Sequence, residues 1–518
     1  MIWMSGQSAT GQTPVAAPSH DELGPNLILF FSFYLTLIML LALWSRALAR
    51  RAASGNFYRG LRRFNQVMFV ARFMVPVWFF VGVRYLSWSA VGAMLSPPLA
   101  RSVVGLAMGT FPPIATWMAL WWAQYPAERA MREQNLLVDL DNDLPLYRPP
   151  AFLAYFTSNF RNQVLFTLLP VLIWKTLFDC ISWTANVATG RPGFAELAPF
   201  AESVALFSST AIVFLFAPAV LRWVLSTSPM PDSPLHRRLD GLCRRAGVRY
   251  RRILVWNTHH NIGNAAVMGV LPFLRYVLLT DVLLERMSDE EIEAVFAHEL
   301  GHIVHRHMTW YAVLFIVLIL SIISLAALVG QWPIFAPYFN PTQFAMGGFL
   351  VMFPLFYGAL SRRCERQADV YAARTLEMLK AEEPLTSQGL FDARQLATVG
   401  AGPLVTPKAA RDAHVGEYGA WLFASALRRV ATINNIPIAP RTRSSAGVWN
   451  RFLHWADGMV DMCNNWLHGS IASRMQYLQD LSADPRRTGH FDRTMFWLYC
   501  GLLLALVSSV VLMSIQAM

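Results

Sequence analysis

The feature that most constrains this chain is a run of 53 residues, from Thr309 to Ser361, that contains no Asp, Glu, Lys, Arg or His. One helix needs about 20 predominantly apolar residues to cross the hydrocarbon core of a bilayer, so the run is long enough for two crossings. Its middle, WPIFAPYFNP, is neutral and rich in proline. The run therefore predicts a transmembrane hairpin, which returns the chain to the side of the membrane that it left.

The composition extends this interpretation to the whole chain. Of its 518 residues, 55% are hydrophobic and 14% are charged, whereas soluble domains carry about 25% charged residues. Eight apolar stretches are long enough to span a bilayer, and with eight spans every arginine-rich loop lies on one side, which the positive-inside rule makes the cytoplasm. The predicted spans are 26–46, 66–92, 103–123, 164–186, 200–224, 309–331, 342–361 and 494–515.

Charge and cysteine content narrow the possible partners. The formal net charge is +11, which the arginine-rich loops of a multi-pass protein explain, and no nucleic-acid-binding motif is present. We therefore expect the lipid bilayer, and not nucleic acid, as a partner. The five cysteines are scattered without a CxxC pair, which argues against a disulfide framework and a cysteine-rich metal site.

The polar region before the hairpin predicts a small mixed domain. RRILVWN (251–257) and RYVLLTD (275–281) are rich in branched apolar residues, as strands are. Ser288 followed by Glu291 forms a capping-box pattern that marks the start of a helix.

That helix carries the motif HELGH. His298 and His302 are four residues apart, so both imidazoles lie on one helical face and can bind one zinc ion. Glu299 lies beside the first histidine, where it can take a proton from the water that the zinc activates. His305 would be about 10 Å further along the helix than His298, too far to share the ion. His307 would point to the opposite face, so we expect both of these histidines at the solvent or headgroup surface.

The third ligand is expected after the hairpin. Glu365 follows it by about one helical turn, as His302 precedes it by less than two, so the hairpin can bring them together. Asp369 lies one turn beyond Glu365, where it can hydrogen-bond a ligand imidazole. The alternative interpretation is an interfacial charge cluster with the neighbouring arginines, Arg362, Arg363 and Arg366.

LLERMSDEEIEAVFAHELGH, a neutral hairpin and ERQADVYAA together resemble metallopeptidase family 48, which holds the HtpX-type quality-control proteases and the CAAX prenyl endopeptidases. NAAVMG, SALRRVA and HGSIASRM resemble three further family segments. The resemblance implies that Asn264 and Ala265 bind substrate, and that His468 and Arg474 lie near the active site, with His468 steadying the tetrahedral intermediate. Gly469 stands where the family usually has proline.

We therefore expect a mainly helical protein: a bundle of about eight transmembrane spans with a zincin-like α+β catalytic domain at the cytoplasmic face. The expected divisions are a disordered tail (1–25), an N-terminal membrane region (26–225), the first catalytic part (226–308), the hairpin (309–361), the second catalytic part (362–493) and a last helix (494–518).

The predicted function is that of an endopeptidase with one Zn²⁺ per chain, in a bacterial inner membrane, that cleaves membrane-associated or misfolded proteins. Two alternatives stay open. One is a CAAX-type processing endopeptidase that acts on lipidated C-termini. The other is a transporter or substrate-binding membrane protein with an incidental HExxH motif, against which no inverted repeat is visible.

Overall fold

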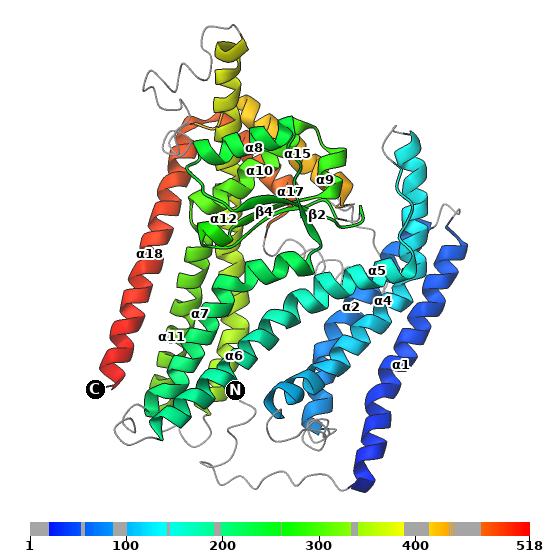
Figure 1. Ribbon diagram of the computed structural model, residues 1–518, viewed down its shortest axis with the longest axis vertical. Helices are drawn as coiled ribbons and strands as arrows, with labels where there is room; N and C mark the ends of the chain where they lie inside the picture. Colours follow the sequence, from blue (N-terminus) through cyan, green and yellow to red (C-terminus); the bar gives the residue numbers. More distant parts are fainter. Residues whose placement is uncertain are drawn as a thin grey trace. The chain divides into compact units, whose positions relative to one another are not determined.

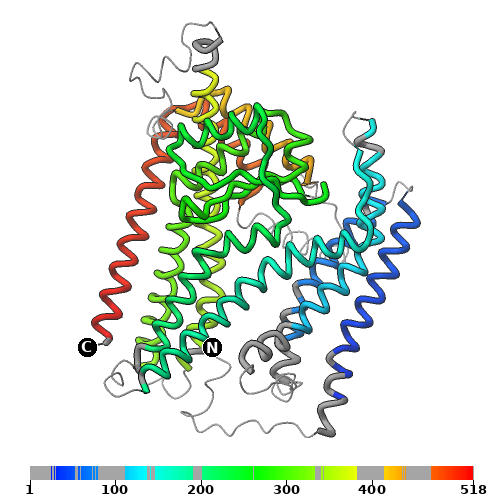
Figure 2. Tube along the Cα trace, viewed as in Figure 1, coloured from blue at the N-terminus to red at the C-terminus, as the bar shows by residue number. Residues whose placement is uncertain are grey.

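The structure is a computed structural model that describes residues 20–52, 57–85, 101–141, 146–190, 198–260, 262–332, 340–387, 414–434, 436, 438 and 468–517 (Figure 2). The chain divides into two compact units, Met1–Phe214 and Leu215–Met518, which are described separately.

The first unit is built from long helices. Its core lies where α1 and α2 pack on α4, around Phe64, Met68 and Leu120, which are almost fully buried. The hydroxyl of Ser45 joins two of these helices, since it accepts a hydrogen bond from Ala127 N at 3.0 Å. The elements are α1 (His20–Arg50), α2 (Phe57–Tyr85), α4 (Arg101–Asp141), α5 (Phe152–Asn159), η1 (Phe160–Leu165), α6 (Phe166–Thr189) and the first half of α7 (Ala198–Val224).

Six helices in the described part of the chain are long and apolar enough to cross a membrane. They match six of the eight predicted spans, and the chain is an integral, multi-pass membrane protein. The other two predicted spans, 66–92 and 103–123, fall on α2 and α4, and residues 86–100 lie outside the described part. The six spans are Phe31–Arg50, Phe152–Ala188, Ala201–Val224, His307–Gly330, Gln343–Ala381 and Pro485–Gln516.

The second unit contains a four-stranded sheet in the order β1-β2-β4-β3. Strands β2 and β4 are the two that the sequence predicted; they pair in parallel, and the outer strands pair antiparallel to them. Side chains alternate between faces along a strand. Ile253 and Val277 therefore join the main core, while Leu254 and Tyr276 form a small cluster on the opposite face. The strands are β1 (Thr227–Pro229), β2 (Arg252–Trp256), β3 (Ala265–Met268) and β4 (Tyr276–Thr280).

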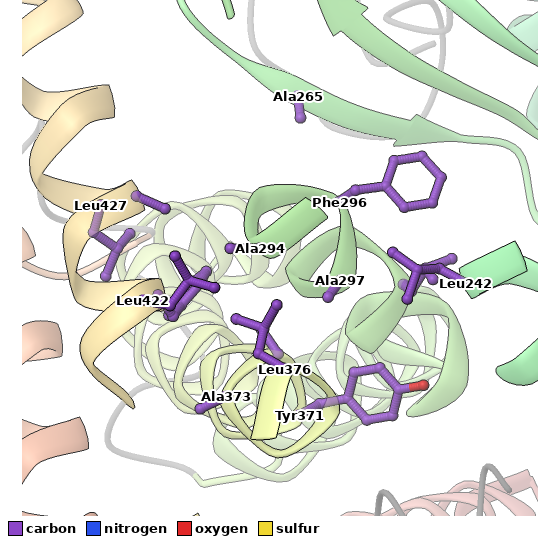
Figure 3. Close-up of a cluster of buried hydrophobic side chains, with 14 of the residues drawn as sticks. Leu242, Ala265, Ala294, Phe296, Ala297, Tyr371, Ala373, Leu376, Leu422 and Leu427 are labelled. Atoms are coloured by element: carbon purple, nitrogen blue, oxygen red, sulfur yellow. The ribbon is translucent and has the colours of Figure 1, made fainter. Parts of the chain in front are cut away.

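Helices pack on one face of this sheet and on one another, as Figure 1 shows for α8, α10 and α15 (Figure 1). Figure 3 draws the core around α10, where Leu376 of α12 and Leu422 of α15 lie on one side of the helix and Phe296 points away from them. The helices are α8 (Pro234–Arg245), α9 (Asp281–Arg286), α10 (Asp289–Val304), α11 (His307–Gly330), α12 (Pro341–Ser387), α15 (Glu417–Ile433), α17 (Ile471–Ala483) and α18 (Pro485–Ala517), with one turn of 3₁₀ helix, η3 (Pro272–Leu274).

The hairpin that the sequence predicted is formed by α11 and α12, which pack against each other. Its turn, 333–339, lies outside the described residues. Helix α12 continues without a break from the membrane-spanning part into residues 362–387, which carry Glu365 and Asp369. There α10 and α12 lie so close that a Cβ on Gly301 would be 2.9 Å from the Cα of Ala368. Glycine at this position therefore permits the close approach of the two helices that carry the candidate ligands.

Candidate metal centre

The first two candidate ligands are held by α10. Ser288 and Glu291 form the predicted capping box at its start, where the Ser288 hydroxyl accepts from Glu291 N at 3.2 Å and the Glu291 carboxylate accepts from Ser288 N at 3.2 Å. The helix then places the His298 and His302 Nε2 atoms 3.2 Å apart. Both nitrogens point at the same place, as the spacing of the motif predicts.

Helix α12 supplies a carboxylate to the same place. The Oε2 atom of Glu365 lies 3.6 Å from His298 Nε2, and its Oε1 atom lies 3.6 Å from His302 Nε2. A tetrahedral ion with ligand bonds of 2.0–2.1 Å would hold its ligand atoms about 3.3 Å apart. The three donors, which all lie within 4.8 Å of one another, therefore fit one zinc ion in both spacing and chemistry.

The orientation of His298 is fixed by groups from three helices. Its Nδ1 atom lies 2.9 Å from Asp369 Oδ1, and Arg474 donates to both oxygens of that carboxylate at 2.8 and 2.5 Å. The ring also stacks on Phe423 at a centroid distance of 5.6 Å. A carboxylate on the far nitrogen of a ligand histidine sets the tautomer that leaves Nε2 free for a metal.

His302 is oriented by a chain of hydrogen bonds that the sequence analysis missed. Its Nδ1 atom lies 2.8 Å from His307 Nδ1, and His307 Nε2 lies 3.0 Å from Gln367 Oε1. The hydroxyl of Tyr499 also donates to that oxygen, at 2.6 Å. Because the oxygen can only accept, His307 donates from Nε2 and accepts at Nδ1. His302 then donates from Nδ1, which leaves its Nε2 lone pair directed at the metal position.

The expectation that His307 faces solvent is therefore wrong: its side chain is fully buried. The expectation assumed one continuous helix, but α10 ends at Val304 and α11 begins at His307. Arg306 between them has a left-handed backbone, with φ of 54°. This break turns His307 back toward His302. The histidine at the start of an otherwise uncharged span was the available signal, since a buried polar group there needs a partner.

Glu299 is partly buried beside these groups, and its electrostatics suit proton transfer. Burial raises its pKa to about 7, against the opposing charge of His298 and with the help of Glu365. For His298, burial lowers the pKa, but the contacts with Asp369 and Glu365 outweigh burial and raise the pKa to about 9. Burial, together with His298, holds the pKa of His302 well below its usual value.

His468 comes from the turn before α17. Its Nδ1 atom lies 3.0 Å from Glu365 Oε1, and 62% of its side chain is exposed. Gly469, which follows, has φ of +73°. Proline is fixed near −65° and cannot adopt that conformation, so the turn differs locally from the proline-containing family pattern. The Arg474 guanidinium lies 3.5 Å from Glu365 and so contacts both Glu365 and Asp369.

Asn264 and Ala265 lie at the start of β3, an edge strand that pairs with β4. The residue that positions this strand was not predicted from the sequence. Asn434, at the end of α15, accepts from Gly263 N at 3.0 Å and donates to Gly263 O at 2.7 Å. A Cβ at Gly263 would lie 2.5 Å from Ile433 Cγ2, so glycine is needed for this approach.

Two histidines one helical turn apart, a glutamate beside the first and a third carboxylate from another helix define the class of zincin metallopeptidases with a glutamate ligand. Residues 229–421 match Peptidase family M48. The chain is a membrane metalloendopeptidase whose catalytic region is similar to that family, which disfavours the transporter interpretation.

The relatives share the enzyme class and differ in coverage. A "Protease HtpX homolog" from Aeropyrum pernix is 25% identical over 319 residues, which cover 58% of this chain and 92% of that protein. A "CAAX prenyl protease 1 homolog" from Arabidopsis thaliana is 26% identical over 178 residues, 32% of this chain and 41% of that protein. The crystal structure of S. mikatae Ste24p has a TM-score of 0.41 at 15% identity and covers 88% of this chain and 99% of that chain.

Proposed function

We propose that this chain is a zinc endopeptidase in which His298, His302 and Glu365 hold one ion. The observation that carries the proposal is the spacing of the three donor atoms, 3.2–3.6 Å. The other nitrogen of His298 lies 2.9 Å from Asp369, and that of His302 lies 2.8 Å from His307. When bound, zinc in such a site polarises the scissile carbonyl and makes water more acidic.

The remaining groups account for proton transfer and charge. With a pKa of about 7, Glu299 can take a proton from the attacking water at neutral pH and deliver it to the leaving amine. His468 would donate a hydrogen bond to the oxyanion that forms on the substrate carbonyl. Asp369 and Arg474 position His298 and Glu365 without touching the substrate.

Substrate backbone would pair with the edge strand β3. An exposed edge binds an extended peptide through main-chain hydrogen bonds, which tolerates many sequences. Ala265 begins that strand and Asn264 directly precedes it. The two hydrogen bonds between Asn434 and Gly263 hold it next to α15. The strand packs directly against α10, the helix that carries His298 and His302, so bound substrate would extend past the metal position.

The location of the site favours membrane-associated or misfolded proteins as substrates. Both catalytic parts lie on the side of the bilayer to which the hairpin returns, and we assign that side to the cytoplasm of a bacterial inner membrane from the arginine-rich loops. Cleavage of lipidated C-termini is the second candidate, supported by the relatives named as CAAX prenyl proteases.

One comparison separates these substrates. We expect the purified chain to cleave an unfolded protein, a peptide without lipid and the same peptide carrying a prenyl group. The kcat/KM values for the first two should lie within about tenfold of the value for the prenylated peptide, since a tenfold difference corresponds to a single modest contact. A strong preference for the prenylated peptide, by a factor of a thousand or more, would instead favour the processing enzyme. Peptide cleavage followed by mass spectrometry measures both.

Substitution of His307 by alanine tests the hydrogen-bond chain behind His302. We expect zinc affinity to fall about 10- to 100-fold, the usual effect of removing an outer partner of a ligand histidine. His490→Ala is the control, because it removes an exposed histidine of α18. Zinc competition with a chromophoric chelator gives both affinities, and equal values for the two variants would contradict the assigned tautomer.

A further inference from the structure

The sheet has a second face, directed away from the metal centre, and this face contains a cavity of about 380 Å³. Strands β1 and β2 form its floor. Pro229 pairs with Leu254 in the sheet register, and alternation places Thr227 and Arg252 on the same face as this pair. The end of α7 forms the remaining wall through Arg222 and Trp223.

The chemistry of the lining suits an anion attached to an apolar group. Arg222 and Arg252 are among the residues that line the cavity, and no acidic residue does so among the described residues. The Arg222 guanidinium lies over the rings of Trp223 and Tyr276, at 5.7 and 5.5 Å from their centroids. Arginine in such a fixed position favours a phosphate oxygen. Trp223, Pro229 and Leu254 supply the apolar surface.

The place of the cavity along the chain identifies the source of that phosphate. The candidate span Ala201–Val224 ends beside it. Trp223, on the last turn, is 73% exposed, and tryptophans at span ends lie at the level of the lipid headgroups. Arginines at span ends extend to the same level. A cavity lined by both therefore opens where phospholipid phosphates are concentrated.

We propose that this cavity binds the phosphate of an anionic phospholipid, with Arg222 and Arg252 on the phosphate and the apolar wall against the glycerol and the first methylenes. Basic pockets beside span ends are a recurring form of lipid recognition. The bound lipid would fix the end of α7 and the β1–β2 edge at headgroup level. Because β2, β4 and β3 are continuous in one sheet, it would also set the height of the edge strand above the bilayer.

Lipid binding to the full chain in detergent tests this proposal by native mass spectrometry, which requires no protease activity. The probes are dioctanoyl phosphatidylglycerol, dioctanoyl phosphatidylcholine and inorganic phosphate. We expect one tightly retained phosphatidylglycerol, about tenfold weaker phosphatidylcholine binding from the loss of net charge, and no competition by inorganic phosphate at equal concentration. Equal binding of the two lipids would overturn the anionic site, and competition by phosphate would assign it to a free anion.

Variants locate the lipid. Arg222→Gln combined with Arg252→Gln should weaken phosphatidylglycerol binding at least about tenfold. Arg252→Gln alone, at an exposed residue, should weaken it several-fold and serves if the double variant does not fold. Arg251→Gln is the matched control, since it removes the same charge one residue earlier, outside the cavity. Wild-type retention in Arg252→Gln, or an equal loss in Arg251→Gln, would contradict the assignment.

Discussion

Replacing Glu299 with glutamine is expected to leave zinc in place while peptide cleavage falls by about 10²- to 10⁴-fold, the usual contribution of a general base. The amide has the shape of the carboxyl group but cannot take a proton from water at neutral pH. The three candidate ligands are His298, His302 and Glu365. Glu299 is not one of them, so the variant should contain as much zinc as the wild type. Zinc per chain and the cleavage rate of one peptide are measured on the same preparation.

Glu290→Gln is the matched control for this variant. Glu290 lies on the first turn of the same helix and is exposed, so its substitution removes a carboxylate from α10 far from the metal position. It should cleave at the wild-type rate. A Glu299→Gln protein with full activity would end the assignment of Glu299, and loss of zinc from it would mean that its role is structural.

Replacing Glu365 with alanine is expected to remove most of the zinc, from about one ion per chain, since a site with three protein ligands loses one of them. The variant also removes the carboxylate that Arg474 and His468 contact. Glu365→Gln keeps the side-chain volume and should lose zinc as well, which separates ligand loss from a packing defect. Elemental analysis of the purified protein measures the metal, and a melting temperature measures folding.

Asp480→Ala serves as the control, because Asp480 is an exposed carboxylate of α17, the helix that also carries Arg474. It should keep its zinc. Wild-type zinc in Glu365→Ala would show that the third ligand comes from another residue. No zinc in any of these proteins from metal-replete cells would contradict the metal centre as a whole.

The positions of His298, His302 and Glu365 were predictable because they depend on one helix and one hairpin, whose geometry follows from residues close together in the sequence or in the hairpin. The spacing of His298 and His302 fixes their common face through the helical repeat. Glu365 follows His302 by 63 residues along the chain. The two nevertheless come together, because a two-helix hairpin is a stiff unit whose ends must meet. The strands 252–256 and 276–280 were predictable for the same reason, since their apolar residues are contiguous.

The outer contacts were not predictable in this way. His307 depends on a break between α10 and α11 at one left-handed residue, Arg306, and its partner Gln367 is 60 residues away. Asn434 meets Gly263 across 171 residues, with no periodic pattern to connect them. The identity of such partners follows from how α11, α12 and α15 pack, and each of these helices has several polar residues that could have faced the site.

The sequence by itself predicted six of the membrane-spanning helices, the HExxH motif and the glutamate that the hairpin returns to it, because hydropathy and helical repeat act over short distances. Only the tertiary structure decided which nitrogen of each histidine is free for the metal, because the tautomer depends on what contacts the opposite side of the ring. The same is true of the arginine-lined cavity. Arg222 and Arg252 belong to one site only because β1 and β2 pair behind the end of α7.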